Sequence, residues 1–113
     1  MIRRKLSEFS GGWFVGDFEP SAFRIPECEV AYKQHAKGEQ YGMHYQRYAW
    51  EINYLIRGQI LVRHLDGREE RVKAGEVFIF PPGERYAAQP VFEEDCEVIC
   101  VKSPSLPNDK VIV

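Results

Sequence analysis

Residues 38–58 read GEQYGMHYQRYAWEINYLIRG, and this stretch decides how the rest of the chain is interpreted. His44 and Gln46 are two residues apart, so on a β-strand their side chains project from the same face. Glu51 joins them from the next strand if the chain turns back around residues 47–49. Three polar groups aimed at one point of an otherwise apolar pattern are costly to bury without partners. The stretch therefore predicts a site.

A second stretch, residues 75–86, reads GEVFIFPPGERY. Its apolar run at 77–80 predicts a buried strand, and the Pro-Pro-Gly that follows is typical of a tight turn. We expect Tyr86 to enter the next strand, at 85–88, and to lie across the interior from the first stretch.

The two stretches together resemble the paired motifs of the cupin superfamily. The first family motif is Gly, five residues, His, one residue, His, three or four residues, Glu, six residues, Gly. The matching residues here are Gly38, His44, Gln46, Glu51 and Gly58, with Gln46 at the position of the second His. The resemblance implies an all-β fold, the small single-domain cupin, which is a double-stranded β-helix or jelly-roll-like barrel.

The second family motif is Gly, five residues, Pro, one residue, Gly, two residues, His, three residues, Asn. Gly75, Pro81 and Gly83 match it, while Tyr86 takes the His position and Pro90 the Asn position. The segment VICVKSPSLPNDK near the end is similar to that of small cupins associated with bacterial surface-polysaccharide synthesis.

The alternation of residue types predicts about nine strands and no helix longer than a turn, which is typical of an all-β sandwich or barrel. The expected strands are residues 13–18, 28–36, 41–46, 50–57, 59–65, 68–73, 77–80, 85–88 and 96–102, with a short edge strand at 111–113. Residues 89–95 are expected to form a loop. We expect one cupin domain over residues 1–113, with a lead-in at 1–12 and the motifs at 38–58 and 75–90.

Composition excludes several classes of partner. The formal net charge is −2, with 15 basic and 17 acidic residues, so no field favours nucleic acid or an anionic membrane. No apolar run approaches the roughly 20 residues of a membrane span, and residues 1–10 lack the apolar core of a signal peptide. The three cysteines, Cys28, Cys96 and Cys100, have no metal-type spacing and are expected to be reduced thiols. These features predict a cytoplasmic protein.

Each polar residue near the first motif can have a functional role or a structural role. His44 is either a site residue or a buried histidine satisfied by a backbone carbonyl. Glu51 is harder to explain structurally, because carboxylates are almost never fully buried without a partner. Asn53 and Tyr48 either contact a ligand or make structural hydrogen bonds. Two further histidines, His35 and His64, lie beside charged residues near strand ends and are expected at the surface.

The resemblance also implies a metal site, with His44, Gln46, Glu51 and Tyr86 at the ligand positions. One nitrogen and three oxygens form a ligand set that suits a divalent transition metal such as Zn, Mn, Fe or Ni. Oxygen activation by iron usually uses two His and a carboxylate. Because His44 is the one His at these four ligand positions, a dioxygenase is disfavoured.

Without a metal, His44 paired with Glu51 makes a base whose tautomer the carboxylate holds, and Tyr86 makes an acid across the cavity. This constellation is similar to that of cupin sugar-nucleotide epimerases and ketoisomerases, so we expect a sugar or sugar-nucleotide isomerase or epimerase. Asn53 and Tyr48 would contact the substrate. The alternative is a non-catalytic metal- or ligand-binding sensor. The orientation of Tyr86 distinguishes the two functions. An acid that faces His44 supports catalysis, whereas a Tyr86 side chain turned outward supports a binding role.

The outer face of the strand at 50–57 predicts self-association. If Glu51 faces inward, then Ile52, Tyr54 and Ile56 face outward, and a monomer of this size rarely exposes such an apolar patch. We therefore expect a homodimer, with the strand at 13–18 as a candidate for exchange between chains.

Overall fold

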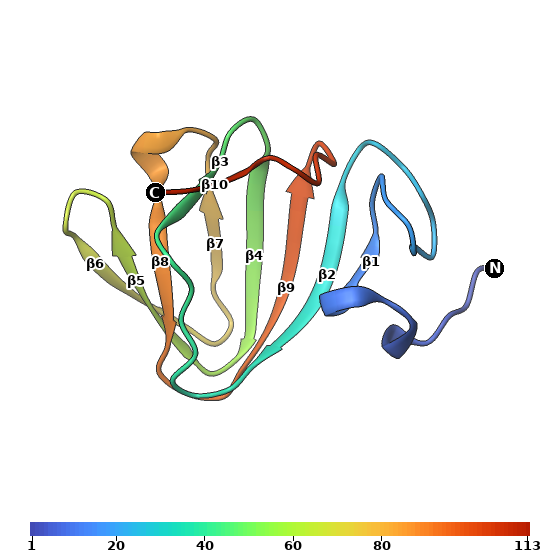
Figure 1. Ribbon diagram of the computed structural model, residues 1–113. Helices are drawn as coiled ribbons and strands as arrows, with labels where there is room; N and C mark the ends of the chain where they lie inside the picture. The colour runs from blue at the N-terminus through green and yellow to red at the C-terminus, as the bar shows by residue number, and fades with distance from the viewer.

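The computed structural model describes residues 1–113 as two antiparallel five-stranded sheets that face each other (Figure 1). One sheet has the order β1-β2-β9-β4-β7, and the other has the order β10-β3-β8-β5-β6. The strands are β1 (Trp13–Val15), β2 (Glu29–His35), β3 (His44–Gln46), β4 (Trp50–Arg57), β5 (Gln59–His64), β6 (Glu69–Lys73), β7 (Val77–Phe80), β8 (Ala88–Phe92), β9 (Cys96–Ser103) and β10 (Lys110–Ile112). The all-β expectation is confirmed.

Helical structure is limited to three short 3₁₀ turns, η1 (Leu6–Glu8), η2 (Ser10–Gly12) and η3 (Glu84–Tyr86). None of them is long and apolar enough to cross a lipid bilayer.

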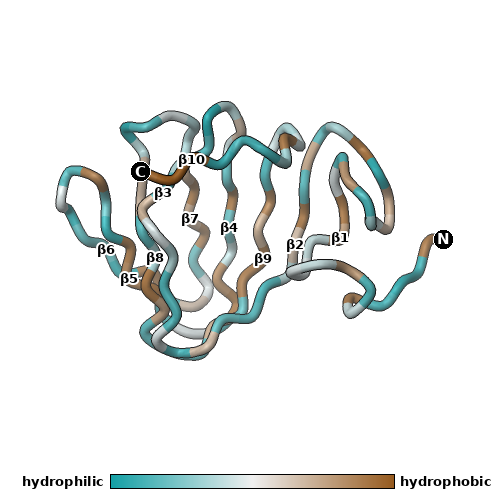
Figure 2. Tube along the Cα trace, in the orientation of Figure 1, coloured by the Kyte–Doolittle hydropathy of each residue, from teal (hydrophilic) through white to brown (hydrophobic).

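The apolar core and the polar interior occupy different ends of the same strands. On β4, the inward residues are Glu51, Asn53 and Leu55, and only Leu55 belongs to the core. The core cluster consists of Leu55, Ile60, Val62, Val72, Ala88, Phe92, Cys96 and Val98. In Figure 2 the apolar segments of β5 and of the last residues of β4 gather at the lower end of the barrel. Polar inward residues are therefore left at the other end of β4.

The segment after the second motif differs from its expected structure. Residues 85–88 were expected to form a strand, but Tyr86 lies on η3 and the strand β8 occupies the expected loop. Pro90 does not break β8, because its carbonyl accepts a hydrogen bond from the Tyr41 amide at 3.3 Å. The nitrogen and carbonyl of one residue point to the same side of an antiparallel strand, so the missing N–H faces away from the ladder with β5.

On two strands, the side chains do not follow the simple rule that apolar residues face inward. On β7, expected to be buried, Val77 and Ile79 are 61% and 50% exposed, because β7 is an edge strand with its outer face open. On β2, Lys33 and His35 turn inward, while the more apolar face turns outward.

The outer side of the first sheet is consequently apolar across four strands. Strand register aligns Val30, Val101, Ile52 and Ile79 in one row. A second row contains Tyr32, Ile99, Tyr54 and Val77. We refer to these eight residues together as the outer apolar face. The short strand β1, a candidate for exchange, pairs with β2 of its own chain.

Candidate functional site

A cavity of about 220 Å³ lies between the two sheets, and His44, Gln46, Glu51 and Tyr86 all line it. These side chains come from β3, β4 and η3, so the fold brings together residues from both sequence motifs. The wall is mixed, because aromatic side chains such as Phe78 alternate with the polar groups.

The His44 imidazole is oriented by the backbone. Its Nδ1 lies 2.8 Å from the carbonyl oxygen of Gly42, and because a carbonyl only accepts, Nδ1 carries the proton and Nε2 keeps its lone pair. The expected hydrogen bond from His44 to Glu51 is absent, and Gly42 holds the tautomer instead. Burial, with the nearby Lys110 ammonium group, lowers the pKa of His44 against the opposing hydrogen bond to Gly42. The imidazole is therefore neutral at neutral pH.

Glu51 and Asn53 form a polar pair on the inner face of β4. The side-chain amide of Asn53 donates to Oε2 of Glu51 at 3.0 Å. Asn53 is buried and Glu51 is half-buried, so this hydrogen bond fixes the carboxylate at the cavity wall. Both side chains present hydrogen-bonding groups toward the interior.

Gln46 is the most unusual residue of the site. Its side chain is only 4% exposed, and neither Oε1 nor Nε2 has a hydrogen-bond partner. A buried amide without partners costs about 1–3 kcal/mol, and native proteins contain few such groups. The Gln46 amide therefore has both its acceptor and its donors free for hydrogen bonds at the cavity.

Tyr86 lines the cavity from η3 instead of from a neighbouring strand. The guanidinium carbon of Arg85 lies 5.0 Å from the centre of its ring, which helps to hold the ring in place. Tyr86 also borders a second cleft, between the edge strands β6 and β7. Its phenol is therefore placed at the boundary between two openings of the barrel.

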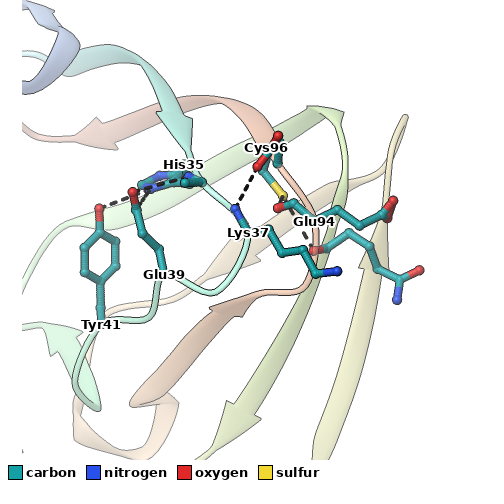
Figure 3. Close-up of polar contacts among 9 residues, drawn as sticks. His35, Lys37, Glu39, Tyr41, Glu94 and Cys96 are labelled. Atoms are coloured by element: carbon teal, nitrogen blue, oxygen red, sulfur yellow. Dashed lines mark hydrogen bonds and ion pairs between the residues drawn. The ribbon is translucent and has the colours of Figure 1, made fainter.

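His35 is a cavity residue that sequence reasoning placed at the surface. It is 7% exposed, its ring stacks on Phe92 at a centroid distance of 3.9 Å, and its Nδ1 lies 2.8 Å from Glu39 Oε2. Figure 3 shows His35 with Glu39 and with the Tyr41 hydroxyl, which approaches the same imidazole. Strand parity placed His35 on the same face as Lys33, but no local sequence signal indicated that this face turns inward.

One expected contact residue lies outside the cavity. Tyr48 is 69% exposed and does not line the cavity wall. The backbone amides of Tyr48 and Ala49 donate to Oδ2 of buried Asp109, both at 2.8 Å. These two hydrogen bonds order the turn between β3 and β4 and leave the Tyr48 ring in solvent.

The cavity is electropositive, although the whole chain has a net charge of −2. Lys33, Lys102 and Lys110 line it, and Glu51 is the single carboxylate in its wall. Cys100 lines it as a neutral thiol, since burial raises the pKa of Cys100 to about 12.

The donor set fits a resident transition metal poorly. No three His, Cys, Asp or Glu side chains come together anywhere in the structure. Of the four expected ligands, Gln46 and the Tyr86 phenol are neutral, so one carboxylate and one imidazole remain as strong donors. Three ammonium groups in the same cavity oppose the binding of a further cation.

Comparison with known proteins identifies a family model described as "Cupin domain", which matches residues 32–102. No curated protein matches the chain. An uncharacterized conserved protein with a double-stranded β-helix domain from Klebsiella pneumoniae superimposes with a TM-score of 0.69 at 17% identity, covering 79% of this chain and 72% of that one.

Two similar structures carry functional names. The DMSP lyase DddQ from Ruegeria pomeroyi superimposes with a TM-score of 0.71 at 16% identity, covering 89% of this chain and 49% of that one. A sugar phosphate isomerase of the cupin superfamily from Silicibacter pomeroyi has a TM-score of 0.62 at 18% identity, covering 70% of this chain and 52% of that one. This chain spans about half the length of both proteins, and identities this low show a shared fold alone.

Proposed function

Because the chain belongs to the cupin family, we propose that its barrel cavity binds a small oxygen-rich ligand such as a sugar derivative and isomerises or epimerises it. The observation that carries this proposal is the buried amide of Gln46, which lines the cavity with both polar atoms unpartnered. An amide offers one acceptor and two donor hydrogens, which is the pattern that hydroxyl and carbonyl groups satisfy.

The size and polarity of the cavity support a ligand of this class. Its volume of about 220 Å³ is below the ~300–1,000 Å³ of pockets for drug-sized ligands, so the ligand is comparable to a monosaccharide. An apolar ligand would leave the buried Gln46 amide without a partner, so this residue disfavours apolar ligands. The similarity to a structure named as a sugar phosphate isomerase is compatible with this class.

The proposed reaction is proton transfer next to a carbonyl group. Neutral His44 accepts the proton at Nε2 from the carbon beside the carbonyl, and the Tyr86 hydroxyl donates a proton to the carbonyl oxygen. His44 then gives the proton to the former carbonyl carbon, while the hydroxyl group on the deprotonated carbon returns a proton to the Tyr86 phenolate and becomes the new carbonyl, which yields the isomer. Epimerisation, in which a proton returns to the opposite face of the same carbon, requires a second donor. Glu51, held by Asn53, accepts hydrogen bonds from substrate hydroxyl groups.

A non-catalytic role is the alternative. Cupins often bind metals, and in such a role His44, Gln46, Glu51 and Tyr86 would hold an ion or a ligand without turnover. The neutral amide and phenol and the ammonium groups beside them favour the metal-independent function for this chain.

Replacement of Gln46 with leucine separates a binding role from a structural one. We expect Gln46→Leu to raise the free energy of unfolding of the ligand-free protein by about 1–3 kcal/mol, because two unsatisfied buried atoms disappear. The same change should remove the binding of neutral and phosphorylated hexoses. Chemical denaturation and isothermal titration calorimetry measure the two effects.

Gln59→Leu is the matched control, since the Gln59 amide donates to Glu93 at 2.8 Å outside the cavity. This variant should lose stability and keep affinity. A Gln46→Leu protein that is less stable than wild type and binds sugars equally well would contradict the proposed role of Gln46.

We also propose that the protein is a homodimer through the outer apolar face. Ile52 lies between Val101 and Ile79 in one row of this face and is 37% exposed. Light scattering at micromolar concentration should give twice the 13.2 kDa of one chain. Ile52→Lys should give a folded monomer, whereas Leu65→Lys, at an apolar residue of similar exposure outside this face, should stay dimeric. A wild-type monomer under these conditions would exclude the dimer.

A further inference from the structure

Three lysines from three different strands meet at the cavity. Lys33 lies on β2, Lys102 on β9 and Lys110 on β10, and all three line the same cavity as Gln46, Lys33 and Lys102 from one sheet and Lys110 from the other. Strand register places Lys110 directly opposite Gln46 in the β3–β10 ladder. It also places Lys102 opposite Glu51 in the β4–β9 ladder.

These ammonium groups are not engaged in ion pairs. None of the three lysines makes an ion pair in the structure. Surface arginines of the same chain are paired, as Arg63 is with Glu69 at 3.0 Å and Arg71 with Glu93 at 3.1 Å. The other lysines of the chain, Lys5, Lys37 and Lys73, are unpaired as well, so what distinguishes these three lysines is their place in the cavity lining.

Aromatic rings hold the lysine side chains in place. The ammonium nitrogens of Lys33 and Lys102 lie 5.1 Å and 5.0 Å from the centre of the same Trp13 ring. The ammonium nitrogen of Lys110 lies 5.4 Å from the centre of the Tyr41 ring. A ring face attracts a cation without neutralising it, so the positive charges are positioned and remain available.

The charges also act on one another. Burial lowers the pKa of Lys33, and the ammonium groups of Lys102 and Lys110 lower it further, against the opposing charge of Glu51. An anion placed among the three lysines would relieve this repulsion.

The geometry points to an anionic ligand: a sugar that carries a phosphate monoester or a carboxylate, bound between Lys33, Lys102 and Lys110 beside Trp13 while its hydroxyl groups reach Gln46. This inference rests on the proposed function, because it assigns a charge to the ligand of the same cavity. A compact anion suits three ammonium groups, each of which is a point charge with three donors. The small volume restricts the ligand to one sugar with one such group.

Calorimetric titration with matched ligands tests the charge of the ligand. The probes are glucose, mannose and galactose, their 6-phosphates, their uronic acids, and inorganic phosphate alone. At least one charged sugar should bind about tenfold or more tightly than its neutral parent, the usual effect of one charge-assisted contact. Added salt should weaken binding of the charged sugar. Comparison of the 6-phosphates with the uronic acids shows whether the bound anion is a phosphate monoester or a carboxylate.

Lys102→Met should remove most of the preference for the charged sugar. The control is Lys73→Met, an exposed lysine on β6 outside the cavity, which should keep the preference. Lys102→Met should also raise the melting temperature of the ligand-free protein, because it removes an unpaired like charge, whereas a structural lysine would lower it on removal.

Two results overturn the inference. Equal affinity for neutral and charged sugars would refute the anion site and leave the proposed sugar site standing. A charge preference that Lys102→Met and Lys73→Met reduce equally would place the anion elsewhere. Binding of inorganic phosphate that Lys102→Met removes, with no sugar bound, would support the anion site and refute the proposed function.

Discussion

Replacing Gly58 with alanine is expected to destabilise the fold by more than about 3 kcal/mol. Gly58 joins β4 to β5 with a φ of +98°, a conformation that L-residues rarely adopt. A Cβ atom at this position would lie 2.5 Å from the carbonyl oxygen of Asp95 and 2.5 Å from Sγ of Cys96. Since the carbonyl belongs to the backbone, the corner of the barrel has to move.

Gly67→Ala is the matched control for this substitution. Gly67 has a φ of +91°, and a Cβ atom there would meet nothing within 4 Å. It should therefore cost only the backbone strain of about 1–2 kcal/mol. Urea denaturation of the three proteins measures the difference. Equal stability of Gly58→Ala and Gly67→Ala would mean that the close contact with β9 does not constrain the fold.

Replacing His44 with asparagine is expected to lower turnover by about 10²- to 10⁴-fold, the usual contribution of a general base. The asparagine amide can donate to the Gly42 carbonyl as Nδ1 now does at 2.8 Å, but it has no basic nitrogen in place of Nε2. The fold should consequently stay intact while the base is lost. Near-wild-type unfolding curves for His44→Asn verify this separation.

His64→Asn controls for the loss of a histidine as such. His64 contacts Glu70 at 2.5 Å and does not line the cavity. Its replacement should leave turnover unchanged. If both variants retained full turnover, His44 would not be the base. If His44→Asn lost stability together with turnover, its role would be structural.

Much of the fold could be predicted from local patterns. The strand β4 has the predicted bounds, Trp50–Arg57, because its alternation is regular and Gly58 ends it. The motif spacings also predicted which side chains of β3 and β4 face the interior. Alternation determines the relative orientation of neighbouring side chains, so the positions of His44, Gln46 and Glu51 followed directly.

Other features depend on tertiary contacts that local patterns do not encode. The alternation in β2 separates two faces but does not say which one is inward, and here the face with Lys33 and His35 turns to the cavity. Pro90 indicated a loop, yet its missing N–H lies on the side away from β5. Local propensity therefore misplaced β8 and put Tyr86 on a strand.

The positive charge of the cavity also could not be predicted from local sequence patterns. Lys33 is far from Lys102 and Lys110 in the sequence, and the packing of the two sheets brings the three lysines together at the cavity. The net charge of −2 gives no hint of an electropositive interior. In the same way, Gln46 could be identified as inward-facing, but the absence of any partner for its amide depends on all of its neighbours.

Exchange of solvent deuterium into candidate sugars tests the central claim most directly. Wild-type protein is incubated in deuterated water with the hexose 6-phosphates, the uronic acids and the neutral hexoses, and each sugar is examined by mass spectrometry and NMR. We expect deuterium at the carbon next to the carbonyl of at least one of these sugars, at a rate that His44→Asn reduces strongly. Absence of exchange in every sugar that calorimetry shows to be bound would contradict the isomerase and leave a binding module.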